Sequence, residues 1–145
     1  MQRYENQTVI VTGGGCGIGS ATCRRLAAEG AKVAVFDMNL DAAEKVAQEI
    51  RAAGGQAQAF RCDITDRAAV DQAVADTVAA LGPIDTLVNN AGWDVFKPFL
   101  KTEAGEWDRL IAINLVGALN MHHAVLPGMV ERKSGRIVNV ASDAA

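Results

Sequence analysis

Residues 8–19 read TVIVTGGGCGIG, and this stretch decides the fold of the chain. The β-branched run Val9–Val11 is typical of a strand that is buried on both faces. Five glycines follow at positions 13, 14, 15, 17 and 19, and a helical pattern starts at Ile18. Glycines let a backbone approach a pyrophosphate closely, and the free N–H groups of a helix start favour negative charge. Strand, loop and helix together predict a nucleotide phosphate site, with a tight turn that binds no ligand as the alternative.

Composition and charge limit the classes of protein to which the chain can belong. Its 145 residues suit one domain, and 50% hydrophobic with 21% charged residues is ordinary globular composition. The net charge of −3 comes without a basic stripe, so we expect no nucleic acid and no membrane as a partner. No apolar run approaches the length of a membrane span, and the polar N-terminus predicts neither a signal nor a transit peptide.

The cysteines indicate the redox compartment. Cys16, Cys23 and Cys62 are odd in number and lack the spacing of a metal site. We therefore expect free thiols, no bound metal and a cytoplasmic location. Cys16 lies inside the glycine loop, where we interpret it as a small residue that the loop tolerates.

Strand and helix patterns alternate along the whole chain. The predicted strands after the first are residues 32–36, 56–61, 85–88 and 136–140. A long helix is predicted from Glu103 to about Val130, with a bend near Pro127. This alternation predicts an α/β fold with a doubly wound parallel sheet, right-handed crossovers and strand order 3-2-1-4-5. In this order the ligand crevice lies at the carboxyl ends of strands 1 and 4.

Asp37 ends the second predicted strand, close to the ~20-residue distance from a glycine loop at which a ribose-binding acid is expected. A carboxylate there accepts hydrogen bonds from the adenosine hydroxyls and repels a 2′-phosphate, so NAD is favoured over NADP. No Lys or Arg lies in the loop or directly after Asp37 to pair with a phosphate. The alternative is an aspartate that only caps the following helix.

Asn114 interrupts the apolar stripe of the predicted long helix. It lies three residues after Ile111 and four after Leu110, and therefore shares the face of these side chains. A buried amide without partners costs about 1–3 kcal/mol. We expect Asn114 to be buried and hydrogen-bonded; a structural tie to a neighbouring loop and a catalytic role both stay open.

Motifs in this order resemble those of the short-chain dehydrogenase/reductase family. Thr12 and the loop glycines match its TGxxxGxG motif, and residues 89–92 match its NNAG motif after the fourth strand. An aspartate after the third strand, an asparagine in the long helix and a serine after the fifth strand follow in family order as Asp63, Asn114 and Ser142. The resemblance covers essentially the whole chain. It implies a Rossmann-like fold and NAD-dependent dehydrogenation of an alcohol or reduction of a ketone.

The resemblance also implies a set of cofactor-binding residues. In the family, the aspartate in the place of Asp63 meets the adenine, and the backbone of the next residue, here Ile64, lines the same pocket. By itself, Asp63 would be interpreted as a turn residue. The amides of the NNAG motif hold a strand end in shape while its small residues let the cofactor pass. The cofactor-binding candidates are Thr12, Gly13, Cys16, Gly17, Ile18, Gly19, Asp37, Asp63, Ile64, Asn90, Ala91 and Gly92.

Two catalytic residues are implied by the resemblance. Asn114 takes the place of the asparagine in the family's Asn-Ser-Tyr-Lys tetrad, where it supports a proton-relay water. Ser142 takes the place of the serine that binds the substrate oxygen and steadies the catalytic tyrosine. By itself, a serine after a strand is a routine turn or cap residue. Tyr4 is the only tyrosine and precedes the first strand, so the family's Tyr-x-x-x-Lys motif has no match.

From this departure we expect the chain to be the N-terminal part of a longer single-domain enzyme, with a sheet that is incomplete beyond the fifth strand and no activity alone. The whole enzyme is expected to be a homo-oligomer that acts on a small alcohol or ketone. Within the family, residues 1–41 and 93–98 resemble dehydrogenases of 2-hydroxycyclohexanecarboxyl-CoA, which implies a hydroxyacyl thioester substrate. A non-catalytic dinucleotide-binding module stays the alternative. A methyltransferase fits less well because it leaves the NNAG motif unexplained.

Overall fold

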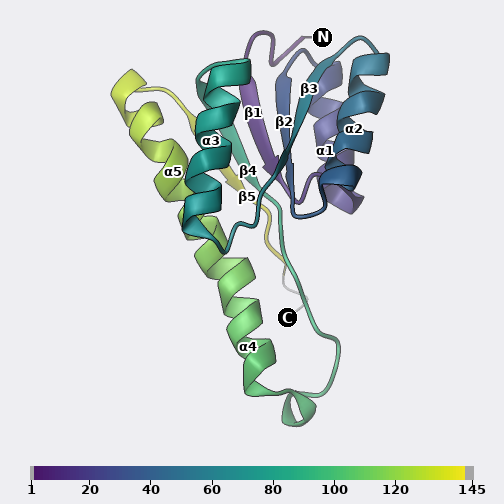
Figure 1. Cartoon of the computed structure of the whole chain (residues 1–145), viewed down its shortest axis with the longest axis vertical. Helices are drawn as coiled ribbons and strands as arrows, with labels where there is room; N and C mark the ends of the chain where they lie inside the picture. The colour runs from purple at the N-terminus through teal and green to yellow at the C-terminus, as the bar shows by residue number, and fades with distance from the viewer. Residues whose placement is uncertain (1, 143–145) are drawn as a thin grey trace.

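The computed structural model describes residues 2–142, which form an α/β structure around one parallel sheet (Figure 1). The strand order β3-β2-β1-β4-β5 and the parallel direction of every pairing confirm the predicted fold class. The strands are β1 (Thr8–Thr12), β2 (Lys32–Asp37), β3 (Gln56–Arg61), β4 (Ile84–Asn89) and β5 (Arg136–Asn139).

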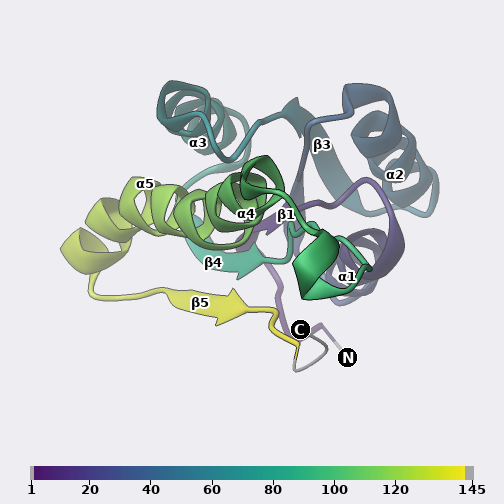
Figure 2. The same ribbon diagram turned by 90° about the horizontal axis from the view of Figure 1, so that it is seen from below.

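Helices cover both faces of this sheet (Figure 2). One face packs against α1 (Gly17–Ala28) and α2 (Leu40–Ala52), and the other packs against α3 (Arg67–Leu81) and α5 (Gly117–Arg132). These two layers leave a strand no solvent-facing side, so strands in the middle of the sheet must be apolar at every position.

The first strand shows how its sequence fits this arrangement. Successive side chains of a strand point to opposite faces, so Val9 and Val11 join the core under α1 and α2, while Ile10 joins the core under α3 and α5. All three side chains are fully buried. Phe36 of β2 extends the second core and packs against Phe60 with ring centroids 5.6 Å apart.

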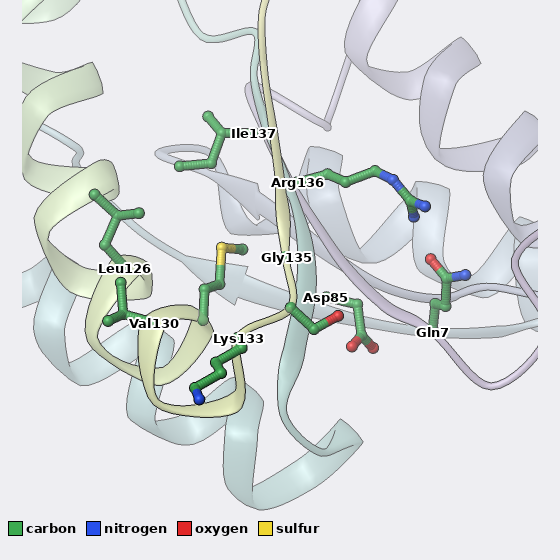
Figure 3. Close-up of a pocket in the computed structure, with 10 residues that line it drawn as sticks. Gln7, Asp85, Leu126, Val130, Lys133, Gly135, Arg136 and Ile137 are labelled. Atoms are coloured by element: carbon green, nitrogen blue, oxygen red, sulfur yellow. The ribbon is translucent and has the colours of Figure 1, made fainter.

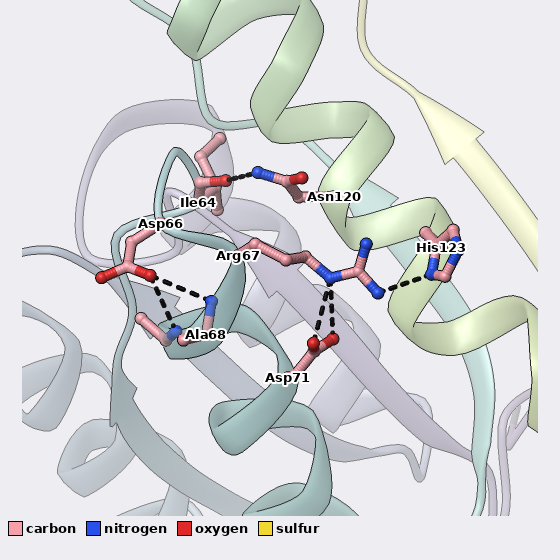
Figure 4. Close-up of polar contacts among 8 residues, drawn as sticks. Ile64, Asp66, Arg67, Ala68, Asp71, Asn120 and His123 are labelled. Atoms are coloured by element: carbon pink, nitrogen blue, oxygen red, sulfur yellow. Dashed lines mark hydrogen bonds and ion pairs between the residues drawn. The ribbon is translucent and has the colours of Figure 1, made fainter.

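Polar contacts between α3 and α5 hold the second layer together (Figure 4). Asp66 caps α3 by accepting hydrogen bonds from the backbone N–H groups of residues 68 and 69. The next residue, Arg67, lies 3.0 Å from Asp71 and 2.5 Å from Nδ1 of His123 on α5. Because arginine can only donate, Nδ1 of His123 accepts this hydrogen bond.

A long helical rod leaves the sheet at its carboxyl ends (Figure 1). It consists of α4 (Ala104–Ile111), the π-helical segment η2 (Ala112–Val116) and α5. Pro127, near which a bend was predicted, lies inside α5, and the helix has π-type hydrogen bonding at η2. A one-turn η1 (Phe99–Lys101) precedes the rod.

The two ends of the rod differ in burial. The buried face of α5 consists of Gly117, Met121, Val125 and Met129, spaced four residues apart. The apolar stripe that predicted a buried face instead remains exposed among the described residues, at Trp107, Ile111, Leu115 and Leu119. The spacing of apolar residues in the sequence indicates that one face of a helix is apolar. Burial of that face also requires another element that covers it.

Residues 104–132 form a helix that is long and apolar enough to cross a membrane by length and composition. The expectation that no stretch approaches this length is therefore wrong. A helix that covers a sheet passes the same test, and the α5 part does cover the sheet through Met121 and Val125. The helix is thus weak evidence for a membrane location.

The fifth strand forms the edge of the described sheet. It pairs with β4 alone among residues 2–142, and Val138 and Val140 are about half exposed. The sheet was expected to be incomplete beyond this strand, and the exposure of the strand follows from its edge position among the described residues.

Candidate active site

A cavity of about 440 Å³ lies at the carboxyl ends of β1, β2 and β4, where the strand order predicts the crevice. Its lining includes most of the predicted cofactor-binding residues: Gly13, Cys16, Gly17, Ile18, Asp37, Asp63, Ile64, Asn90, Ala91 and Gly92. A larger cavity of about 710 Å³ lies at the other end of the sheet, beside Gln7, Asp85 and Arg136 (Figure 3). None of the predicted site residues lines that second cavity.

The glycine loop has a shape that larger residues would block. Gly13 and Gly17 adopt positive φ angles of 63° and 52°, in the left-handed region that favours glycine. A Cβ atom on Gly19 would lie 2.1 Å from the carbonyl oxygen of Gly13, so α1 could not approach the loop as closely. The loop is therefore built for close backbone approach, which is what a bound pyrophosphate requires.

Thr12 and Asn90 join the loop to the end of β4. The Thr12 hydroxyl accepts hydrogen bonds from the backbone N–H groups of Asn90 and Ala91, both at 3.0 Å. The Asn90 side chain in turn donates to the carbonyl oxygens of Thr12 and Gly13. Thr12 and Gly19 do not line the cavity, and Thr12 is almost fully buried behind it. We interpret both as residues that shape the loop.

The Asp37 carboxylate is held in place by two backbone N–H groups. Its Oδ2 accepts from Gly15 at 2.9 Å, and its Oδ1 accepts from Asn39 at 2.9 Å. The cap of α2 is Asn39, whose side chain accepts from Ala42, so the interpretation of Asp37 as the helix cap is wrong. A carboxylate has about four acceptor positions, so Asp37 keeps capacity for ribose hydroxyls.

Asp63 stabilises a turn by hydrogen bonds and also lines the cavity. Its Oδ1 accepts hydrogen bonds from the backbone N–H and the hydroxyl of Thr65, at 2.9 and 2.7 Å. The backbone oxygen of Ile64 accepts from the Asn120 side chain at 2.9 Å, which ties this turn to α5 (Figure 4). Burial raises the pKa of the neighbouring Cys62 thiol to about 12, so this cysteine lines the cavity in its protonated form.

Asn114 lies in the π-helical segment η2 and is bound to the loop that follows β4. Its Oδ1 accepts from the Trp93 backbone N–H at 2.9 Å, and its Nδ2 donates to the Trp93 carbonyl oxygen at 2.8 Å. The predicted tie to a neighbouring loop is thus present. The predicted burial is wrong, because Asn114 is exposed on the half of the rod that projects beyond the sheet.

Ser142 follows the fifth strand and is exposed, outside the set of residues that line the cavity. The chain leading to it is fixed by β4: the Val140 backbone N–H donates to the Asn89 carbonyl oxygen at 2.9 Å. The Asn89 side chain also donates to Oδ1 of Asn139 at 3.0 Å. Ser142 therefore follows a strand end that is tied to the NNAG motif.

Trp93, expected from the sequence to be core or pocket wall, lines the cavity, and sequence reasoning missed Phe36, Met38, Cys62, Arg109 and Ile113. The guanidinium carbon of Arg109 lies 4.2 Å from the ring centroid of Trp93, a cation–π contact. The position of Trp93 directly after the NNAG motif was a signal for its place at the site. Arg109 gave no such signal, because an arginine on a polar helix face is usually solvated.

Comparisons with known proteins agree with this geometry. The family described as short chain dehydrogenase matches residues 7–145. D-threitol dehydrogenase of Mycolicibacterium smegmatis is 42% identical over 144 residues, which cover 99% of this chain and 55% of the relative. The chain belongs to the short-chain dehydrogenase family, and it spans about half the length of the curated relatives it matches.

Two solved structures that are similar to this chain contain a nicotinamide cofactor, NADH in one and NADP in the other. A 7α-hydroxysteroid dehydrogenase complexed with NADH and 7-oxo glycochenodeoxycholic acid has a TM-score of 0.92 and 36% identity, over 97% of this chain and 55% of that one. A metagenomic short-chain oxidoreductase in complex with NADP has a TM-score of 0.91 and 37% identity, over 97% of this chain and 64% of that one.

Proposed function

We propose that this chain is the cofactor-binding part of an NAD-dependent oxidoreductase that interconverts a secondary alcohol and a ketone. The observation that carries the proposal is the Asp37 carboxylate, which is fixed by Gly15 and Asn39 at the cavity formed by the glycine loop. A fixed negative charge at the end of β2 suits the free hydroxyls of NAD and repels the 2′-phosphate of NADP. Because the solved neighbours include complexes with both cofactors, Asp37 is what favours NAD here.

The glycine loop and α1 supply the other parts of a dinucleotide site. The free N–H groups at the start of α1 would hold the pyrophosphate, with Cys16, Gly17 and Ile18 beside it. Asp63 and Ile64 would line the adenine pocket, and Gly92 leaves room for the cofactor to pass. The lack of side chains at the loop glycines is the feature that makes these residues fit a dinucleotide.

When bound, the nicotinamide cofactor supplies the hydride acceptor or donor. The proposed task of Ser142 is to hold the substrate oxygen by a hydrogen bond, because it follows a strand end fixed beside the NNAG motif. The proposed task of Asn114 is to hold the Trp93 loop and to support a proton-relay water. Neither task makes Asn114 or Ser142 the acid or base that moves the hydroxyl proton.

We also propose a substrate class and an oligomeric state for the whole protein. A small secondary alcohol is the general substrate, and a hydroxyacyl thioester of the 2-hydroxycyclohexanecarboxyl-CoA type is the finer proposal, based on residues 1–41 and 93–98. We further propose a cytoplasmic homo-oligomer for the whole protein, in line with free cysteines and the absence of a basic stripe.

The proposal is tested by measuring the Kd of NADH and of NADPH for the native polypeptide that contains this chain. We expect at least about tenfold tighter binding of NADH, because one repelled phosphate easily changes affinity by the ~1.4 kcal/mol that a factor of ten requires. Asp37→Ala should reduce this ratio, and Asp41→Ala, an exposed acid in the first turn of α2, should leave it unchanged. An unchanged ratio in Asp37→Ala would contradict the proposal. Binding of NADH without oxidation of any secondary alcohol would favour the non-catalytic binding module.

A further inference from the structure

The acidic and basic residues that line the cavity come from different elements of the fold. Asp37 and Asp63 are its acidic residues and follow β2 and β3. Arg109 of α4 is the one cationic residue in the described lining, and it lies beside Trp93. The acids have a proposed partner in the adenosine half of the cofactor. The positive charge of Arg109 has no partner in the function proposed so far.

The contacts of Arg109 leave its hydrogen-bond donors free. One face of its guanidinium lies over the Trp93 ring, and within residues 2–142 no hydrogen bond or ion pair engages its N–H groups. Arg24 and Arg51 show the ordinary alternative, since both pair with glutamates. Stacking occupies the face of a guanidinium and leaves the edge, whose fork of N–H donors matches the two oxygens of a carboxylate or phosphate.

The neighbouring acids do not neutralise this charge. Asp108 precedes Arg109 on the helix, where successive side chains diverge by about 100°. Asp94 accepts a hydrogen bond from the Val95 backbone N–H, and the described residues contain no ion pair between Asp94 and Arg109. Among residues 2–142 the guanidinium, which lines the cavity, therefore has no acidic partner.

The position of this cation is fixed relative to a predicted catalytic residue. Asn114 holds the Trp93 backbone through two hydrogen bonds, and the Trp93 ring supports the Arg109 guanidinium. An ion pair between Lys97 and Glu106 at 2.6 Å ties the same loop to α4. Arg109 is thus held beside the Trp93 loop that Asn114 binds, on a different element from the acidic residues.

We propose that Arg109 and Trp93 form a recognition site for an oxyanion group, a carboxylate or phosphate, carried by the alcohol substrate away from its reacting carbon. The inference rests on the proposed function and narrows its substrate class to anionic alcohols. The cofactor pyrophosphate is the other anion near the cavity, but the glycine loop and the start of α1 already offer N–H groups to it.

The experiment compares two alcohols that differ by one carboxylate, 4-(1-hydroxyethyl)benzoate and 1-phenylethanol. NAD-dependent kcat/KM is measured for both with the native polypeptide and its variants. We expect the native protein to prefer the carboxylate by about 10- to 100-fold, the range of charge-assisted hydrogen bonds. In Arg109→Gln the ratio should fall close to one, and Arg109→Lys should keep part of it. Arg136→Gln removes an equal charge at the far end of the sheet and should leave the ratio unchanged.

A second measurement does not depend on turnover. Calorimetric titration with the ketones 4-acetylbenzoate and acetophenone, in the presence of NAD+, which has no hydride to transfer to a ketone, reports whether binding of the carboxylate depends on Arg109. Equal binding of both ketones, or a preference that survives Arg109→Gln, would overturn the inference while leaving dehydrogenase activity intact. Arg109-dependent binding without oxidation of either alcohol would support the oxyanion site and count against the proposed reaction. A rise in the Kd of NADH alone in Arg109→Gln would assign the charge to the cofactor and overturn the inference.

Discussion

The sheet and the projecting segment of residues 91–116 are held in place by different physical means. In the sheet, Val9, Val33 and Phe36 are fully buried between two helix layers. In the projecting segment, Phe96 is 90% exposed and Leu100 is 95% exposed. The sheet side of the site is thus fixed by burial, whereas the opposite wall depends on a few directional contacts.

Those contacts can be named one by one. Asn114 binds the Trp93 backbone, Lys97 pairs with Glu106, and the indole N–H of Trp107 donates to the Thr102 hydroxyl at 2.7 Å. The Trp107 ring also stacks on Phe99 with centroids 5.6 Å apart. Each contact of this type contributes about 1 kcal/mol, so the wall can be adjusted by single substitutions that the sheet would not tolerate.

The largest effect is expected from a pair of phenylalanine substitutions, one in each region. Phe36→Ala should lower the free energy of unfolding by about 3–5 kcal/mol, because it removes a fully buried ring that packs against Phe60. Phe96→Ala should change it by about 0.5 kcal/mol or less, because that ring is exposed. Urea denaturation of both variants measures the difference. Similar losses in both would show that the projecting segment is packed as tightly as the sheet.

The second prediction compares two glycines. Gly19→Ala should weaken NADH binding at least about tenfold, since the new Cβ would lie 2.1 Å from the Gly13 carbonyl oxygen and force the loop to move. Gly105→Ala, where a Cβ meets nothing within 4 Å, should leave NADH binding unchanged. Titration of NADH fluorescence measures both. Native-like affinity in Gly19→Ala would mean that the loop is not the cofactor cradle.

The third prediction concerns the polar tie of the projecting segment. Asn114→Ala should lower the local stability of the Trp93 loop by about 1–2 kcal/mol, because two hydrogen bonds to the Trp93 backbone are lost. Asn114→Asp keeps the acceptor for the Trp93 N–H but places a second acceptor against the Trp93 carbonyl oxygen, so it should lose at least as much. Hydrogen exchange of the Trp93 amide is the measurement. Equal exchange in native protein and both variants would show that the tie does not hold the loop.

The smallest effect is a dependence on pH. The hydrogen bond from Lys97 lowers the pKa of Glu106 in the folded chain, so the stabilising contribution of this carboxylate is present above its unfolded pKa, about 4.3. The contribution is lost as the pH falls through the lowered folded value. The protection factor of the Glu103 amide, which donates to Glu106 at 2.8 Å, should therefore fall as the pH falls through that lowered value. Glu106→Gln should remove this dependence, and Glu29→Gln, which alters an ion pair beside α1, should leave it intact.

The sheet could be predicted from the sequence because each of its signals is local. The run Val9–Val11 and the glycines after it define a buried strand, a loop and a helix without reference to any distant residue. Parallel sheets with alternating helices have few possible topologies, so the strand order followed. The place of Asp37 at the cavity followed from its position at the end of the second strand.

The projecting segment could not be predicted in the same way. Trp107 and Leu115 form an apolar stripe whose pattern is the same whether or not another surface covers it, so their exposure had no local signal. The burial expected for Asn114 failed for this reason. Arg109 was missed because its place at the cavity depends on a contact with Trp93, sixteen positions earlier in the chain. A contact between residues so far apart in the sequence leaves no local pattern.

The π-helical segment η2 affects the rotation of α4 about the helix axis relative to α5. A π turn takes in about one residue more than an α turn, and each residue of a helix corresponds to about 100° of rotation. The extra residue within Ala112–Val116 therefore fixes the angular phase of α4 relative to α5. Deleting one residue within η2 would turn the π turn into an α turn and leave this phase nearly unchanged. Deleting one residue of regular α-helix between Arg109 and Met121 would instead rotate Arg109 by about 100° about the helix axis relative to the sheet. The π turn is thus the part of the rod where a one-residue change in length leaves the orientation of Arg109 the same.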